Sequence, residues 1–129
     1  MLELHAARSA ESLNDEWIVL ENPGPNDFVS QGCRVTVAKG QGRPRLVGSI
    51  DPGFVLHPGE KIRLVTGSPG KKSHGPPPDE KKDLKNYHLF LGGPILSGVG
   101  TVVRLVLNQV EMAKGTFDPD TKDGLAKEA

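Results

Sequence analysis

The chain has 129 residues, of which 36% are hydrophobic, and its 16 basic and 16 acidic residues give a formal net charge of zero. A domain of this length can bury enough apolar surface to fold without a metal, and the single cysteine excludes an internal disulfide. The balanced charge excludes the overall basic excess that nucleic-acid-binding proteins usually carry. The 16 glycines and 11 prolines lie between short apolar runs, which predicts many turns and favours an all-β domain.

The N-terminal part predicts two strands. Residues 2–6 alternate in polarity and predict a short edge strand within an N-terminal arm, residues 1–12. Residues 16–21 predict the first clear strand, in which Ile18 and Leu20 share one face. An Asn-Pro-Gly-Pro turn ends this strand, because proline cannot donate to a ladder.

Three strands are predicted in the middle of the chain, at residues 33–37, 45–50 and 61–65. Cys33 falls on the same strand face as Val35 and Val37, which favours a buried, inert thiol. Residues 66–85 form a long irregular stretch with three consecutive prolines and five lysines. A loop this long is typical of functional or disordered segments.

The C-terminal part predicts strands at residues 87–91, 101–107 and 110–113, and residues 118–129 are predicted to be a mobile tail. Seven to nine short strands without helical periodicity predict an all-β, immunoglobulin-like two-sheet antiparallel sandwich. The sandwich itself is expected to span residues 13–117.

Four segments resemble a known family. They are residues 17–24 (WIVLENPG), 30–35 (SQGCRV), 54–64 (FVLHPGEKIRL) and 101–112 (TVVRLVLNQVEM). Their order and turn residues resemble the lamin-tail domain, the immunoglobulin-like sandwich at the C-terminal end of nuclear lamins. The family usually has Trp where this chain has Cys33, so we expect compensating bulk from Trp17 or Phe54. The resemblance implies a non-enzymatic domain that binds proteins, DNA or chromatin.

The long loop is the main candidate binding site. Its lysines could contact phosphate, and its prolines could enter an aromatic-lined groove of a partner protein. Three acidic residues interrupt the lysines and no aromatic residue accompanies them, which favours a solvated or peptide-binding loop. The candidate residues are Lys71, Lys72, His74, Pro76, Pro77, Pro78, Lys81, Lys82 and Lys85.

No motif predicts catalysis, a metal or a cofactor. The histidines (His5, His57, His74 and His88) lack the spacing of a zinc site. A thiol hydrolase would need a base close to Cys33 and a lowered thiol pKa. We therefore expect no catalytic residue, no metal site and no cofactor, and a small hydrolase is the weakest alternative.

These observations predict a binding or scaffolding module that contacts proteins, with nucleic-acid association through residues 71–85 as the alternative. An open sandwich also presents sheet edges to a partner strand or to a second copy of the chain. Residues 2–6 or 110–113 are expected to form that exposed edge. The sequence contains no secretory signal and no run long enough to span a membrane, so we expect a cytoplasmic location.

Overall fold

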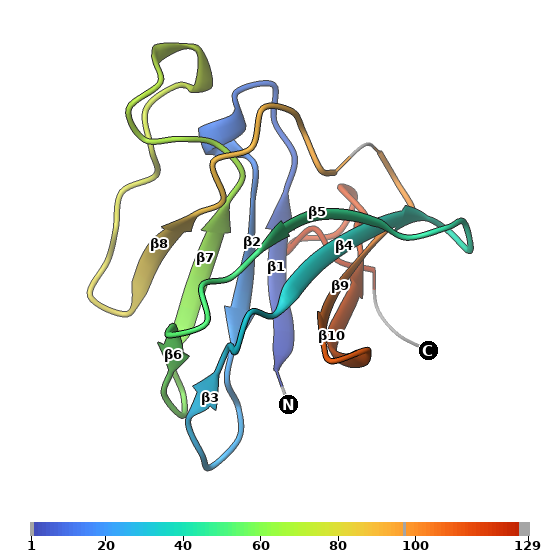
Figure 1. Cartoon of the computed structure of the whole chain (residues 1–129). Helices are drawn as coiled ribbons and strands as arrows, with labels where there is room; N and C mark the ends of the chain where they lie inside the picture. The colour runs from blue at the N-terminus through green and yellow to red at the C-terminus, as the bar shows by residue number, and fades with distance from the viewer. Residues whose placement is uncertain (1, 97, 127–129) are drawn as a thin grey trace.

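The computed structural model describes residues 2–96 and 98–126, and these residues form an all-β sandwich (Figure 1). Two short 3₁₀ helices accompany the strands, η1 (Leu13–Asp15) and η2 (Lys72–His74). The ten strands are β1 (Glu3–Arg8), β2 (Trp17–Glu21), β3 (Phe28–Val29), β4 (Arg34–Lys39), β5 (Arg45–Ser49), β6 (Val55–Leu56), β7 (Lys61–Val65), β8 (Leu84–His88), β9 (Thr101–Leu107) and β10 (Val110–Thr116).

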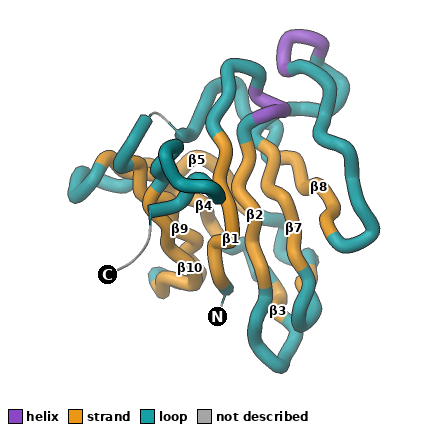
Figure 2. The backbone as a smooth tube through the Cα atoms, turned by 180° about the vertical axis from the view of Figure 1, so that it is seen from behind, coloured by secondary structure: helices purple, strands orange, loops and turns teal. Residues whose placement is uncertain are grey.

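Two four-stranded sheets face each other. The first sheet has the strand order β1-β2-β7-β8, and Figure 2 shows these four strands side by side from behind. The second sheet has the order β10-β9-β4-β5. The short strands β3 and β6 pair with each other at one end of the sandwich. The predicted two-sheet sandwich is therefore confirmed.

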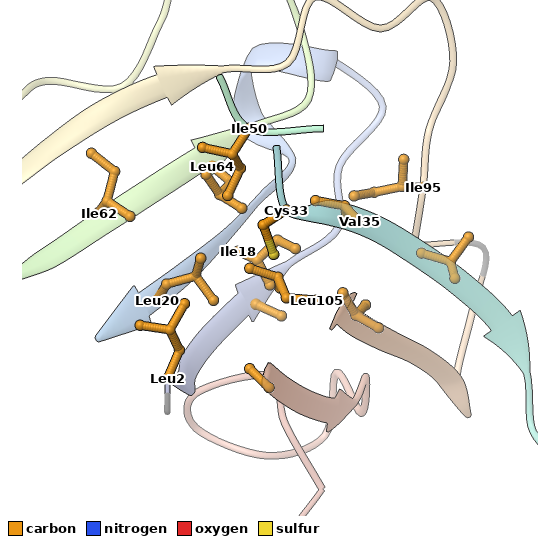
Figure 3. Close-up of a cluster of buried hydrophobic side chains, with 14 of the residues drawn as sticks. Leu2, Ile18, Leu20, Cys33, Val35, Ile50, Ile62, Leu64, Ile95 and Leu105 are labelled. Atoms are coloured by element: carbon orange, nitrogen blue, oxygen red, sulfur yellow. The ribbon is translucent and has the colours of Figure 1, made fainter. Parts of the chain in front are cut away.

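The core lies between the inner faces of the two sheets (Figure 3). Alternation of side chains directs Ile18 and Leu20 inward from β2, and Val35 and Val37 inward from β4. Of these two faces, only that of β4 was predicted to be buried. Cys33 lies in the middle of this cluster and is fully buried. Phe54 packs against the margin of the core, where its ring centroid lies 5.2 Å from that of Tyr87.

Trp17 does not supply the bulk that we expected beside Cys33. It occupies the outer face of the first sheet, because the next residue, Ile18, points into the core. The guanidinium carbon of Arg63 lies 5.1 Å from the centroid of the Trp17 ring. Arg63 also donates through Nη1 to Asn86 Oδ1 at 3.0 Å, so its side chain extends across the outer face of β7.

Two details of the predicted sandwich need correction. The described residues form ten strands where seven to nine were predicted, because β3 and β6 are only two residues long and give no periodic signal. The pair β7–β8 is parallel, whereas antiparallel sheets were predicted. The long connection between these strands allows the chain to cross over and return in the same direction.

The first and last strands close one side of the sandwich. The Leu2 N–H donates to the Met112 carbonyl at 3.1 Å, which joins the segment before β1 to β10. The segment after β10 folds back, and the Ala7 N–H donates to the Asp123 carbonyl at 2.8 Å. Phe117 and Leu125 form a further antiparallel bridge. Residues 118–126 of the predicted mobile tail thus have defined backbone partners, and residues 127–129 lie outside the described chain.

Candidate functional site

The base of the long loop is held by buried polar groups. Asn14 of η1 donates through Nδ2 to the carbonyls of Ser68 (2.9 Å) and Gly75 (2.7 Å). His74 is buried, and its Nδ1 accepts a hydrogen bond from the Ser68 N–H at 2.9 Å. His74 therefore holds the loop together, and it is not available to assist phosphate binding as the sequence suggested.

The loop lysines are all exposed, but they are not gathered into one site. Lys71 and Lys72 line a shallow hollow of about 320 Å³ with Pro69, Gly70, Gly75 and Pro76. The segment with Lys81, Lys82 and Lys85 turns back along β8, and Pro77 lies exposed between the two groups. The Pro78 carbonyl accepts from Asn86 Nδ2 at 2.7 Å, which fixes the end of the proline run against β8.

The structure gives Cys33 no means of acting as the nucleophile of a hydrolase, which was the weakest alternative from the sequence. Cys33 is fully buried, and this burial raises the pKa of its thiol, which opposes formation of the reactive thiolate. His57 pairs with Asp27 at 2.8 Å, and the hydrogen bond and charge of Asp27 raise the pKa of the imidazole. This pair lies on the exposed surface. No group of three or more His, Cys, Asp or Glu side chains that could hold a metal occurs in the described ranges.

Glu16 is a buried carboxylate with a structural set of partners. Its Oε1 accepts from Thr66 Oγ1 and from the Ile95 N–H, both at 2.8 Å, and its Oε2 accepts from the Leu96 N–H at 3.2 Å. Burial raises the pKa of this carboxyl group, against the effect of these three hydrogen bonds. Glu16 therefore fastens the connection after β8 to the first sheet.

The two edges that the sequence indicated are not the open ones. Strands β1 and β10 are the outermost strands of their sheets, but they adjoin each other, and β1 also bonds to the C-terminal segment. The strands at the other two edges are β8 and β5. Pairing with a partner along residues 2–6 or 110–113 would therefore compete with contacts inside the chain.

The outer edge of β8 is largely covered by the segment that precedes it. Lys81 and Leu84 exchange two backbone hydrogen bonds, at 2.9 and 3.1 Å. The next outward N–H, that of Asn86, donates to Glu80 Oε2 at 2.8 Å. These contacts leave little of this edge for another strand.

The outer edge of β5 carries no neighbouring strand in the described chain. The Ile50 N–H donates to the Cys33 carbonyl at 2.8 Å, so the Ser49 N–H, on the alternate side of the strand, points away from β4. Leu46 on the same strand is 56% exposed. A groove of about 220 Å³ runs beside β5, and it is lined by Arg45, Leu46, Val47, Leu91, Gly92, Gly93, Pro94 and Ile95.

The segment of sequence that contains β5 is basic. No acidic residue occurs between Asp27 and Asp51, whereas four basic residues occur in that interval. All four are exposed: Arg34, Lys39, Arg43 and Arg45. The zero net charge of the chain therefore conceals a segment whose charged residues are all basic and which contains an open sheet edge.

Sequence reasoning missed β5 as a candidate site. The run at residues 45–50 was predicted as a strand, but its position at a sheet edge depends on pairings between distant residues. The absence of acidic residues from 28 to 50 was a visible signal that could have directed attention there. The lysine-rich loop has more cations, but acidic residues lie among them.

Comparison with known proteins adds no relative: no family model matches the chain, and no curated protein matches it. No helix in the described chain has the length and apolar character needed to span a membrane.

Proposed function

We propose that this chain is a non-catalytic protein-binding module, an immunoglobulin-like domain of the lamin-tail type. Its binding site is the outer edge of β5, which takes up an extended, acidic segment of a partner protein. The observation that carries the proposal is the open edge of β5, together with the exposed Leu46 and the groove beside it.

Strand addition matches the chemistry of this edge. A partner strand would supply backbone groups to the outward-pointing groups of β5, and alternate side chains would enter the groove beside Leu46. Backbone bonds give affinity that is largely independent of sequence, and the side chains in the groove give selectivity.

The charge around β5 favours an acidic partner over a second copy of the chain. Arg43 and Arg45 would be attracted to aspartate and glutamate side chains, which would speed association and fix the register. A second copy would bring the same cations to the interface, and residues 28–50 contain no acid to neutralise them. Self-association through β5 is therefore the disfavoured outcome.

The experiment uses a displayed library of random short peptides selected on the whole chain. We expect the selected peptides to be enriched in aspartate and glutamate next to apolar residues. The variant Ser49→Pro removes the outward N–H, and its ring blocks the approach of a strand. Proline is tolerated on an edge strand where the N–H faces solvent, so this variant should fold.

The control is Ser49→Ala, which retains the backbone N–H. Peptide binding should persist in Ser49→Ala and disappear in Ser49→Pro, while thermal unfolding remains cooperative in both proteins. Equal binding by the two variants would contradict strand addition, as would selection of peptides without acidic residues. Sedimentation of the free protein as a dimer that Ser49→Pro dissociates would support a second copy of the chain as the occupant instead.

A further inference from the structure

Two tight turns meet at one end of the second sheet (Figure 1). The first turn contains Gln31 and Gly32, with φ angles of 49° and 82°, and precedes β4. The second contains Asn108 and Gln109, with φ angles of 50° and 68°, and joins β9 to β10. A hollow of about 360 Å³ lies between them, with Val106 and Leu107 among its lining residues.

Three of these four turn residues occupy the left-handed region although they are not glycine. In a two-residue hairpin with both φ values positive, Asn-Gly is the preferred sequence, and glutamine at the second position is strained. Strained residues of this kind cluster at ligand-binding sites, because the surrounding fold holds side chains there in a required position. The three strained residues that line the hollow, Gln31, Asn108 and Gln109, all carry a carboxamide side chain.

Arg34 provides the only charge among the lining residues. It begins β4 on the outer face of the sheet, opposite Val106 on β9 and Ser49 on β5. Among the described residues, no acidic side chain forms an ion pair with it. The nearby acidic residue Glu111 instead pairs with Arg104, at 3.3 Å. The guanidinium of Arg34 therefore remains available to a ligand.

We infer that this hollow binds a small monoanionic carboxylate that also carries hydroxyl or amino groups. The planar guanidinium matches a carboxylate with two parallel hydrogen bonds. A single cation balances one negative charge, so a carboxylate fits better than a phosphate dianion. The carboxamides of Gln31, Asn108 and Gln109 each offer both N–H donors and a carbonyl acceptor, which suits a ligand rich in hydroxyl or amino groups.

The size of the hollow agrees with this class of ligand. Small-molecule sites have volumes of roughly 300–1,000 Å³, and this hollow lies near the lower limit. An amino acid or a sugar acid would fit, whereas a longer polymer would have to extend onto the sheet. No residue of β5 lines the hollow, so the inference does not rest on the proposed peptide binding.

The test is a titration of the isotopically labelled protein, monitored by NMR. The signals observed are the side-chain N–H of Arg34 and the carboxamide groups of Gln31, Asn108 and Gln109. The probes are galacturonate and L-glutamate, with galactose as the uncharged counterpart of the sugar acid and inorganic phosphate as the dianion. We expect one or both carboxylates to move these signals at millimolar concentration, and galactose and phosphate to leave them in place. Absence of any shift with both carboxylates overturns the inference, as does an equal response to galactose or a response to phosphate alone.

Three variants test the assignment of the residues. Arg34→Gln removes the charge from an exposed position and should weaken binding about tenfold or more. Lys114→Gln is the matched control, because it removes a cation from the same sheet outside the hollow, and it should bind normally. Gln109→Gly creates the preferred Asn-Gly turn, so we expect a higher unfolding temperature together with weaker binding. Unchanged binding by Arg34→Gln, or equal weakening by Lys114→Gln, would overturn the inference.

Discussion

Buried polar side chains fix the connections of this sandwich as firmly as the apolar core fixes its sheets. Glu16 receives three hydrogen bonds from segments that lie far away in the sequence. Asn14 and His74 hold the long loop in a similar way, through hydrogen bonds with its backbone. A buried donor or acceptor that loses its partner destabilises the fold by more than the hydrogen bond contributes when formed, so these residues should be sensitive to substitution.

The variant Glu16→Gln should lower the free energy of unfolding by about 1–3 kcal/mol, because the amide offers one acceptor oxygen to three donors. Chemical denaturation measures the change. The control Glu11→Gln alters an exposed side chain and should stay within about 0.5 kcal/mol of the unmodified protein. Equal stability of the two variants would contradict the role of Glu16 as a fastening group.

Glu16 should also make stability depend on pH. Burial raises its pKa in the folded chain above the ordinary value, so its contribution is complete below the ordinary pKa and declines as pH rises through the raised value. Glu16→Gln lacks this titration. The difference in unfolding free energy between the unmodified chain and Glu16→Gln should therefore decrease as pH rises from the ordinary pKa of glutamate through the raised pKa of Glu16. An increase of this difference would contradict the raised pKa.

Gly67 lies at a position of the long loop where there is no room for a side chain. A Cβ built there would lie 2.6 Å from Asn14 Oδ1 and 3.0 Å from His74 Nδ1. Gly67→Ala should therefore lower the free energy of unfolding by about 1–3 kcal/mol. In the control Gly70→Ala the new methyl group meets nothing within 4 Å, so thermal unfolding should hardly change.

At the scale of the strand, the sequence predicts features that depend on neighbouring residues, and it misses contacts between residues that are far apart in the chain. Alternation in residues 33–37 identified β4 and its inward face, because period two directly encodes burial on one side. Residues 16–21 identified β2 but not its inward face, because both faces of this strand carry apolar residues. The prediction of the open edge was wrong. The sequence of β1 and β10 is typical of edge strands, but it does not show that these two strands contact each other. The same limit applies to the hollow at Arg34, which forms only when two turns separated by more than half of the chain meet.

The C-terminal segment behaves as an additional element that covers β1. Gly124 has a φ of 83°, and a Cβ there would collide with the Ala7 carbonyl. We expect Gly124→Ala to detach this segment, which amide hydrogen exchange would detect as faster exchange of the Ala7 N–H. Gly53→Ala, at a position with open space around it, should leave that exchange unchanged. Retained protection in Gly124→Ala would show that the segment can rearrange around the new methyl group.

Considered as a whole, the molecule combines zero net charge with a strongly uneven distribution of charge. The balance of 16 acids and 16 bases correctly excluded a basic protein overall, but it gave no indication that residues 28–50 carry only cations. Local potentials over a surface govern association more than the net charge does. The lysine-rich loop attracted attention because it holds five lysines, whereas the signal around β5 is the absence of acidic residues beside fewer cations.

This uneven distribution should be visible in chromatography. At neutral pH and low salt, we expect the protein to be retained on a cation exchanger despite its zero formal charge. Replacement of Arg43 and Arg45 by glutamine should shorten the retention more than replacement of Lys81 and Lys82, whose neighbours include Glu80 and Asp83. Equal effects of the two double variants would argue against a basic surface centred on β5.

The contact between β1 and β10 determines when the β1 side of the sandwich can close during folding. Leu2 and Ala7 precede their backbone partners at Met112 and Asp123 by more than 100 residues. Until those partners have been synthesised, this side of the sandwich stays open, and its exposed amides are at risk of pairing with neighbouring nascent chains. Closure of this side therefore has to wait for the C-terminal segment, and loop-closure entropy makes it slow.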